Sequence, residues 1–263
     1  MVHPEDNTDL DALLLNIEKV LENKHKEIAK LHNREDFRKE FLGNVSHELK
    51  TPLFTAQGYI LTLLDADVSD KKLHRKYLKK AARSIERLDF IVKDLDMISK
   101  LETGMDLKYE TFNIIKLISD VFDMLEIRAG KKNITLSFDK VYEYPLFVNA
   151  DLKRIEQVLI NLISNSINYG NINGTTTVSV RNFLKDRFII KIKDDGIGIE
   201  QKDLPRLFER FYRVDKSRSR KQGGSGLGLS IVKHIVEAHK QQIFAESSLG
   251  KGSAFSFTLK KIV

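Results

Sequence analysis

His47 is followed directly by Glu48 and, one helical turn later, by Thr51 in the sequence NVSHELKTP. The apolar residues of this stretch fall on one helical face, so the spacing predicts that His47 and Thr51 share the opposite, exposed face. A neutral imidazole has a free lone pair on one ring nitrogen and can attack phosphorus. Glu48 can hold the proton of the other nitrogen and stabilise the imidazolium that develops. By itself, the pattern is also typical of a charged helix surface.

Asparagines define a second candidate site in the sequence NLISNSINY, residues 161–169. Asn161 and Asn165 are four residues apart and share one helical face, and Asn168 and Tyr169 follow at the end of the stretch. Amide oxygens suit Mg²⁺, a hard ion that takes a few protein oxygens and completes its shell with water and phosphate. Asparagines that only cap or cover a helix are the alternative.

A third candidate has the sequence DDGIG and follows the apolar stretch Phe188–Ile192, which is typical of a strand. Asp194 stands at the strand end, where a carboxylate can accept a hydrogen bond from an exocyclic amino group. Gly196 and Gly198 allow the backbone to approach a flat ring closely. A tight turn without a ligand would have the same sequence.

Two further motifs flank a concentrated basic loop, Lys216–Lys221. The sequence LFERFYR, which ends at Arg213, precedes the loop, and GGSGLGL at residues 223–229 follows it. Glycines that open a helix leave N–H groups free at its positive dipole end, where a phosphate can bind. The glycine spacing is neither a Walker nor a Rossmann fingerprint, and a flexible loop is the alternative.

The histidine lies in a region of helical periodicity that covers roughly the first hundred residues. Its first part, Leu10–Leu31, predicts a coiled-coil helix, and the same phase continues beyond it, so that one long helix can carry both. Pro52 removes a backbone donor and is expected to bend this helix near residues 46–49. A turn at Asp65–Asp70 and a second helix complete the hairpin.

The apolar face of this hairpin is too wide for two helices alone, because about three positions per heptad are apolar rather than two. Two copies of the hairpin can bury such faces against each other as a four-helix bundle. The sequence therefore predicts a homodimer.

The pattern changes after Gly104 to short strands that alternate with helices. Strands are expected at Ile134–Phe138, Thr176–Val180, Phe188–Lys193 and Ala254–Leu259, and helices at Ile114–Arg128, Leu152–Ile167 and Leu227–His239. This order is typical of an α/β sandwich with helices on one face of a sheet. The whole chain is thus predicted to be α+β, a helical hairpin followed by an α/β sandwich.

Composition narrows the chemistry and the partners. The 263 residues contain no cysteine, which excludes disulfides, thiolate metal sites and a cysteine nucleophile. The net charge of +7 comes from basic and acidic residues mixed along the chain, and no basic stripe is interleaved with aromatics, so nucleic acid is not an expected partner. No apolar run approaches the ~18 to 20 residues that span a bilayer.

Taken together and in this order, the motifs resemble the cytoplasmic part of a sensor histidine kinase, and among subfamilies they look closest to the PhoR-like kinases. The match covers Arg34–Val263. It implies a dimerisation and histidine-phosphotransfer hairpin that carries the H-box, followed by a catalytic ATP-binding domain of the Bergerat fold. The resemblance places a connector helix at residues 1–34, the hairpin at 35–103 and the ATP-binding domain at 104–263.

The resemblance also implies roles for the residues of the hairpin. His47 would be the phosphoacceptor and Glu48 its acid/base partner. Thr51 would orient a water molecule for dephosphorylation of a phosphorylated partner. The cofactors that the resemblance implies are ATP and Mg²⁺.

In the ATP-binding domain the resemblance implies that Asn165 holds Mg²⁺, Asp194 binds the adenine amino group and Arg213 binds the γ-phosphate. The other nucleotide-binding residues that it implies are Asn161, Asn168, Tyr169, Gly196, Gly198, Gly224, Gly226, Leu227 and Gly228. Asn161 stands where related ATPases carry a glutamate that activates water. An amide cannot take that proton at neutral pH, so bound ATP is expected to wait for His47.

Asn168 departs from the family pattern, which usually has a lysine at this position. A phosphate contact is then missing, and the basic loop offers Lys216, Arg218 or Arg220 as a replacement. The segment Asp215–Ser225 is expected to form a lid over the triphosphate.

The expected activity is autophosphorylation of His47 from Mg-ATP, then transfer to an aspartate on the receiver domain of a response regulator, with phosphatase activity as well. The expected partners are a second copy of the chain and this receiver domain, and a membrane only through a preceding N-terminal part. The expected location is cytoplasmic, as a soluble kinase or as the cytosolic portion of an inner-membrane receptor. Two alternatives stay open: a Bergerat-fold ATPase that drives a conformational clamp, and a non-catalytic or phosphatase-only dimeric scaffold.

Overall fold

The computed structural model describes residues 5–65, 71–102, 106–214 and 225–262. Several expectations from the sequence fall outside these ranges. They are the interhelical turn after Asp65, the boundary at Thr103 and Gly104, and most of the lid segment with Lys216, Arg218, Arg220 and Gly224.

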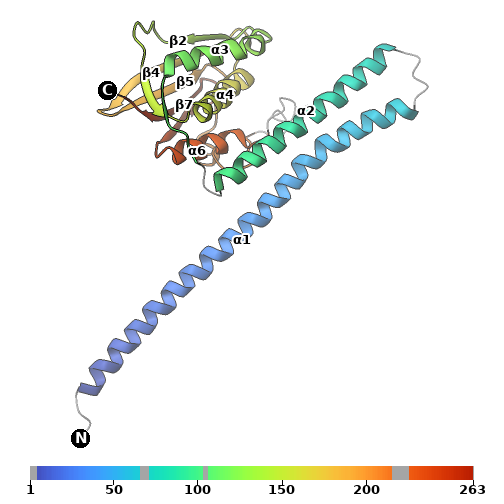
Figure 1. The fold of residues 1–263 in the computed structure, drawn as a ribbon. Coiled ribbons are helices and arrows are strands. Elements are labelled where there is room, and N and C mark those ends of the chain that lie inside the picture. Colours follow the sequence, from blue (N-terminus) through green and yellow to red (C-terminus); the bar gives the residue numbers. More distant parts are fainter. Residues whose placement is uncertain (1–4, 66–70, 103–105, 215–224, 263) are drawn as a thin grey trace.

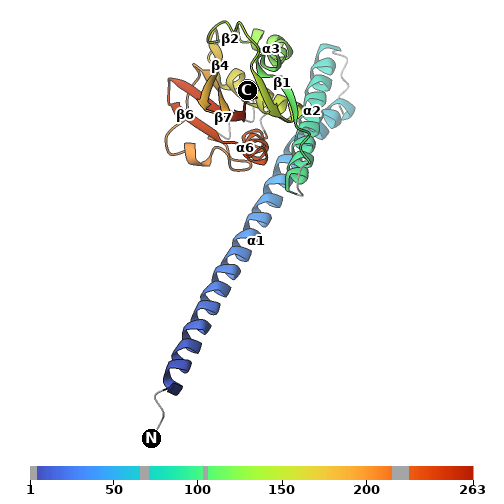
Figure 2. The ribbon, with the colours of Figure 1, turned by 60° about the vertical axis from the view of Figure 1, so that its left-hand side comes forward.

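Two long helices form the first part of the chain. Helix α1 (Glu5–Asp65) has 61 residues, and α2 (Lys71–Glu102) has 32. Figure 1 and Figure 2 show α2 alongside the C-terminal part of α1, while the N-terminal part of α1 extends away from the rest of the molecule. One helix therefore carries the expected connector and the His47 motif, as predicted.

Pro52 does not interrupt α1, which stays helical on both sides of it. The hydroxyl of Thr51 donates to the His47 carbonyl at 3.1 Å, and that of Thr55 donates to the Thr51 carbonyl at 2.8 Å. Side chains thus supply hydrogen bonds in the turn where proline has no N–H to donate. Residues 46–49, where a bend was expected, lie within a continuous helix.

The second part of the chain is an α/β domain. Its elements are β1 (Glu110–Asn113), α3 (Ile114–Gly130), β2 (Thr135–Phe138), β3 (Phe147–Ala150), α4 (Leu152–Tyr169), β4 (Thr175–Leu184), β5 (Arg187–Asp194), the 3₁₀ helix η1 (Leu204–Arg206), α6 (Gly228–Ala238), β6 (Ile243–Ser248) and β7 (Gly252–Lys260). Five strands form one sheet in the order β2-β4-β5-β7-β6, in which only β2 and β4 are parallel. Helices α3, α4 and α6 pack on one face of it (Figure 2). The predicted sandwich is confirmed.

The sequence reading missed three strands. Strands β1 and β3 form a separate two-stranded antiparallel sheet, and β6 lies at the edge of the main sheet. The expectation of a single sheet was therefore wrong. Each strand of the small sheet has only four residues, which is too short to show an alternating pattern.

Buried and less buried side chains alternate along β5, and this alternation decides which of them face the helices. Its buried residues are Phe188, Ile190, Ile192 and Asp194, every second position along the strand. Because successive side chains of a strand point to opposite faces, the three apolar residues that join the core also carry Asp194 to the helix-covered face. The strand pattern thus places a carboxylate at the edge of the core.

The junction between α4 and α6 is fixed by a buried histidine. His239, just after α6, accepts a hydrogen bond at Nε2 from the Asp151 backbone N–H at 3.0 Å, and its Nδ1 lies 2.8 Å from the Ile235 carbonyl oxygen. Since one nitrogen accepts, the other carries the proton, and the ring is neutral. Asp151 in turn caps α4 by accepting from the Arg154 N–H. Burial lowers the pKa of His239, against a smaller opposing effect of the Ile235 carbonyl and the Asp151 charge.

This histidine should make stability depend on pH. Because its pKa is lower in the folded chain, the unfolded chain takes up a proton first, so the stabilisation is complete above about pH 6.5 and is lost as the pH falls towards the folded pKa. His239→Phe should cost about 1 to 3 kcal/mol at pH 7.5, because the Asp151 N–H loses its buried acceptor. Urea unfolding at pH 7.5 and 5.5 should show a smaller difference for the variant than for the wild type. Equal pH dependence in both would contradict this role.

Candidate functional site

Asp194 ends β5 with its side chain buried, only 5% exposed. Its Oδ1 accepts hydrogen bonds from the backbone N–H of Gly196 at 2.9 Å and of Ser253 at 3.1 Å. Burial raises the pKa of this carboxyl, the two N–H groups oppose the rise, and the neighbouring charge of Asp195 adds to it. The bonds hold one oxygen in place, so that the carboxyl group has a fixed direction for recognising a ligand.

The two glycines after Asp194 allow a close approach that no side chain permits. A Cβ on Gly196 would overlap the Tyr169 carbonyl oxygen and lie 2.8 Å from Asp194 Oδ1. Gly198 has a φ of +70° and lies against the Ser248 backbone. The Ile197 N–H donates to the Tyr169 carbonyl at 3.2 Å. The end of α4 and the DDGIG loop therefore form one wall.

The asparagines of α4 lie outside the core face of that helix. Asn161, Asn165, Asn168 and Tyr169 are partly exposed, while the apolar residues between them are fully buried. Asn161 Nδ2 is buried and has no hydrogen-bond partner among the described residues. Its Oδ1 lies 3.5 Å from the position that a Cβ on Gly228 would take. A donor without an acceptor, beside a glycine at a helix start, fits a bound group rich in oxygen.

Gly226, Leu227 and Gly228 build the start of α6. Gly226 has a φ of +77°, and its carbonyl accepts from the Phe211 N–H at 2.9 Å. A Cβ on Gly226 would lie 2.9 Å from Phe211 backbone atoms. Leu227 is fully buried and anchors the turn, while α6 begins at Gly228 with its first N–H groups unused by the helix. The LFERFYR and glycine motifs are thus joined directly.

Asn168 is held by a residue that the sequence reading did not select. Its Oδ1 accepts from Arg128 Nη2 at 3.0 Å, and Arg128 Nη1 lies 3.4 Å from Ser164 Oγ. Lys132 Nζ donates to the carbonyls of Ile167 and Asn168. Burial lowers the pKa of Arg128, and burial together with the Arg128 charge lowers the pKa of Lys132. Two cations from the end of α3 and the following turn therefore contact the end of α4 at Asn168.

His47 stands in solvent, as predicted, with 62% of its side chain exposed. His47 Nδ1 does not donate to Glu48 in this structure, because His47 Nδ1 and Glu48 Oε1 are 3.9 Å apart. Instead, Glu48 Oε2 accepts from Arg87 Nη2 of α2 at 3.1 Å and from Arg213 Nη2 at 2.9 Å. All three side chains of this cluster are mostly buried, Arg213 with only 6% exposed.

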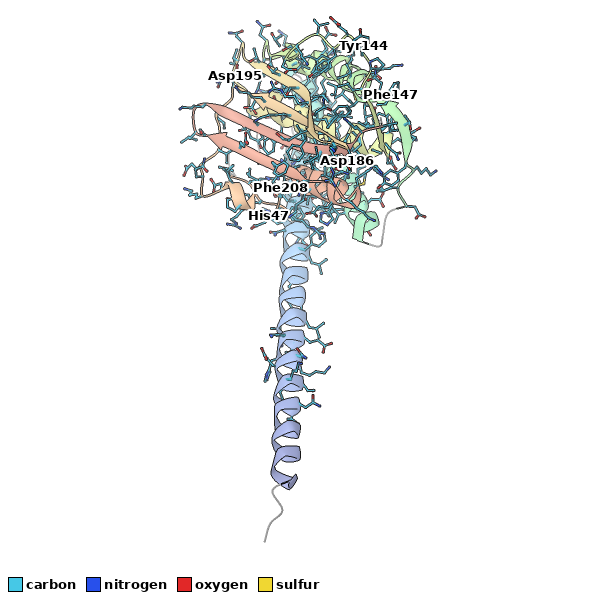
Figure 3. The ribbon with its side chains drawn as sticks, turned by 90° about the vertical axis from the view of Figure 1, so that its left-hand side faces the viewer. His47, Tyr144, Phe147, Asp186, Asp195 and Phe208 are labelled. Carbon is cyan, nitrogen blue, oxygen red and sulfur yellow. The ribbon has the colours of Figure 1, made fainter. Side chains whose placement is uncertain are left out.

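The Arg213 contact brings the two parts of the molecule together at the histidine. Arg213 belongs to the α/β domain and Glu48 to α1, 165 residues apart in the chain. Figure 3 shows His47 where α1 meets the base of the domain, close in that view to Phe208. The sequence reading assigned Arg213 to the γ-phosphate, and the structure places it on the neighbour of the predicted phosphoacceptor.

The described residues fit an adenine nucleotide with a divalent cation. Asp194 offers a fixed acceptor, Asn161 an unsatisfied donor beside the start of α6, and Asn165 a partly exposed amide oxygen one turn further along α4. Among the described residues, no group of three or more histidine or carboxylate side chains forms a metal site of its own. In the same ranges no helix is both long and apolar enough to cross a membrane.

Two family models match the chain. Residues 37–104 match the His Kinase A (phospho-acceptor) domain, and residues 150–262 match the histidine kinase-, DNA gyrase B-, and HSP90-like ATPase. The fold and the site thus define a protein with a phosphoacceptor hairpin and an ATP-binding domain. The chain belongs to the sensor histidine kinases.

Known relatives agree with this placement. The sensor histidine kinase WalK of Bacillus subtilis is 38% identical over 224 residues, which are 84% of this chain and 36% of WalK, so the chain spans about a third of that relative. The solved Acinetobacter baumannii histidine kinase AdeS is 30% identical with a TM-score of 0.65, over 81% of this chain and 97% of AdeS. Histidine kinase ThkA, solved in complex with the response regulator TrrA, is 27% identical with a TM-score of 0.71, over 91% of this chain and 66% of ThkA. The expected family is confirmed, and the PhoR-like subfamily stays a prediction.

The close approach at Gly196 gives a test of the site's architecture. Gly196→Ala should destabilise the chain by about 1 to 3 kcal/mol, because its Cβ has no room beside Tyr169 and Asp194. Gly130→Ala is the matched control, since a Cβ there meets nothing within 4 Å and alanine favours the helix by up to about 1 kcal/mol. Urea denaturation measures both. Similar stability of the two variants would show that the loop does not pack tightly on α4.

Proposed function

We propose that this chain transfers the γ-phosphoryl group of Mg-ATP to His47 and then to an aspartate of a response-regulator receiver domain. The observation that supports this most directly is the position of Arg213, which binds the neighbour of an exposed histidine although it comes from the ATP-binding domain. Phosphoryl transfer depends mainly on positioning and charge neutralisation, so such an arginine beside the acceptor is the arrangement it requires.

His47 would act as the nucleophile. Its Nδ1 faces Glu48 and its Nε2 lies on the far side of the ring, so Nε2 attacks the γ-phosphorus, the bond to the bridging oxygen breaks and ADP leaves. The proton on Nδ1 is then lost to Glu48, which must move from 3.9 Å to hydrogen-bond distance. Arg213 would pass from Glu48 to the transferring phosphoryl group and neutralise its charge.

The nucleotide would be held by the α/β domain. Asp194 would accept from the adenine amino group, Gly196 and Gly198 would give the ring room, and Gly226, Leu227 and Gly228 at the start of α6 would face the phosphates. Gly224, which lies outside the described residues, is proposed as a further nucleotide-binding residue. Asn165, with Asn161, would hold Mg²⁺, whose positive charge would offset that of the phosphates. Asn168, with Arg128 behind it, and Tyr169 would close the end of α4.

We further propose a homodimer. The hairpin exposes large apolar side chains on both helices: Leu42, Leu53, Phe54, Ile60, Leu61, Leu64, Leu78, Ile85, Phe90 and Val92. A monomer leaves this apolar surface in water, whereas a four-helix bundle of two chains buries it. The proposed domains are residues 1–34, 35–103 and 104–263, and the proposed location is cytoplasmic, as a soluble kinase or as the cytosolic portion of an inner-membrane receptor.

Replacing the phosphoacceptor tests the activity. His47→Gln should abolish labelling by ATP carrying a radioactive γ-phosphate, because no ring nitrogen remains, while nucleotide affinity changes by less than about threefold. His74→Gln, at an exposed position on α2, is the matched control and should label like the wild type. Labelling that persists in His47→Gln would refute the assignment. Steady phosphate release without a labelled protein would instead favour the ATPase clamp.

Dephosphorylation of the response regulator is the second proposed activity. Thr51 lies one turn from His47 on the same side of α1, where its hydroxyl can orient a water. Thr51→Ala should slow dephosphorylation of a receiver domain phosphorylated by this chain by about tenfold or more. Thr55→Ala is the control, since Thr55 makes the same kind of backbone bond one turn further on. Equal rates for both variants would exclude the role of Thr51.

A further inference from the structure

The ATP-binding domain docks on the hairpin of its own chain. Ile98 of α2 is 2% exposed and belongs to the same hydrophobic cluster as Phe112, Ile231 and the sheet residues. Phe41 of α1 packs against that cluster, with its ring 5.7 Å from the ring of Phe211. Apolar side chains of both hairpin helices thus extend the core of the ATP-binding domain, so the two parts share one buried interface.

Polar contacts accompany this apolar contact, one of them beside the glycines that open α6. Ser225, next to the glycines that open α6, donates from Oγ to Asp94 Oδ2 of α2 at 2.8 Å. The same Oγ accepts from the Leu227 N–H at 3.2 Å, so Asp94 is connected to the phosphate-facing turn. Arg154 Nη1 of α4 lies 3.2 Å from Met97 Sδ. Contacts at α4 and at the start of α6 therefore fix how the domain faces α2.

The Glu48 cluster completes the interface at the reacting histidine. Arg213 donates to Glu48 Oε2 at 2.9 Å. The other oxygen of this carboxylate, Oε1, lies 3.9 Å from His47 Nδ1, so the Glu48 carboxylate stands between Arg213 and the His47 ring. Glu48 also keeps Arg87 at 3.1 Å, so it stays paired when Arg213 moves to a phosphate. A short shift of one arginine, rather than a swing of the whole domain, would bring its charge to a phosphoryl group beside His47.

The covalent connection agrees with this arrangement. Seven residues, 103–109, lie between the end of α2 and the start of β1. Fully extended, they span at most about 25 Å, which keeps the domain beside the end of its own α2. Lys108, at the end of this connection, donates its N–H to Asp151 Oδ2 at 3.0 Å and so ties it to the cap of α4.

We propose that His47 receives its phosphoryl group from ATP bound to the same chain, so that autophosphorylation occurs in cis within each protomer. The inference rests on the proposed kinase function. It is carried by the intrachain contacts Arg213–Glu48, Ser225–Asp94 and Phe41–Phe211. Transfer between the two chains of a dimer is the opposite outcome.

Heterodimers of complementary variants test the proposal. His47→Gln removes the acceptor and leaves the ATP site, whereas Asp194→Asn removes the charge that binds adenine and keeps an oxygen for the N–H groups of Gly196 and Ser253. The two full-length chains are co-expressed with different affinity tags, and the mixed dimer is isolated over both tags. After incubation with γ-labelled ATP, the cis proposal expects both chains at background level. Label on the Asp194→Asn chain would overturn it.

Matched controls keep the outcome decisive. A wild-type chain paired with the double variant His47→Gln, Asp194→Asn should label only on the wild-type chain, at about half the level of the wild-type homodimer because one chain of two is active. If the wild type fails to label at all, the proposed function itself fails, which is a different result.

Asn165→Ala replaces Asp194→Asn if thermal unfolding shows the latter to be unfolded. If no mixed dimer forms because the chain sediments as a monomer, wild-type labelling that is first order and independent of dilution supports cis transfer, and a rate that rises with concentration overturns it.

Discussion

One carboxylate connects the two parts of this molecule. Glu48 adjoins the exposed His47 and accepts hydrogen bonds from Arg87 of the hairpin and Arg213 of the ATP-binding domain through the same oxygen. Two cations on a mostly buried carboxylate offset the cost of removing it from water. The position of the domain, the setting of the histidine and the availability of Arg213 therefore all depend on this carboxylate.

The nucleotide side depends on a different constraint, the two-residue period of a strand. The residues of β5 that fill the core are in phase with Asp194, so packing the strand also aims the carboxyl group. The loop that follows touches the end of α4 without side chains, at Gly196. Asn161 and Asn165 belong to the partly exposed face of α4, the helix whose end contacts this loop. Each ligand-facing group is thus placed by elements whose apolar residues are committed to the core.

The sequence was sufficient to predict the long, strongly periodic elements and the motifs whose residues lie close together in the chain. It predicted the helix on both sides of Pro52, the α4 and α6 helices, and the position of Asp194 at a strand end. It missed β1 and β3, whose four residues carry no period. It also missed Arg87 and Arg128, because a hydrogen bond or ion pair between residues about 40 positions apart has no local signature. Glu48 lies 3.9 Å from His47 Nδ1 rather than at hydrogen-bond distance, and the arginines that pair with its other oxygen come from distant parts of the chain.

The buried Arg213–Glu48 pair sets how nucleotide and docking interact. Breaking a buried ion pair by removing one partner costs about 3 to 5 kcal/mol, because the other charge is left without compensation. Here Glu48 keeps Arg87 when Arg213 leaves, and a phosphate offers Arg213 more charge than a carboxylate does. The exchange is therefore between two satisfied states and needs no long-lived unpaired charge. In the proposed mechanism, Glu48 can therefore hold the domain before the nucleotide is bound and release Arg213 once a phosphate is there.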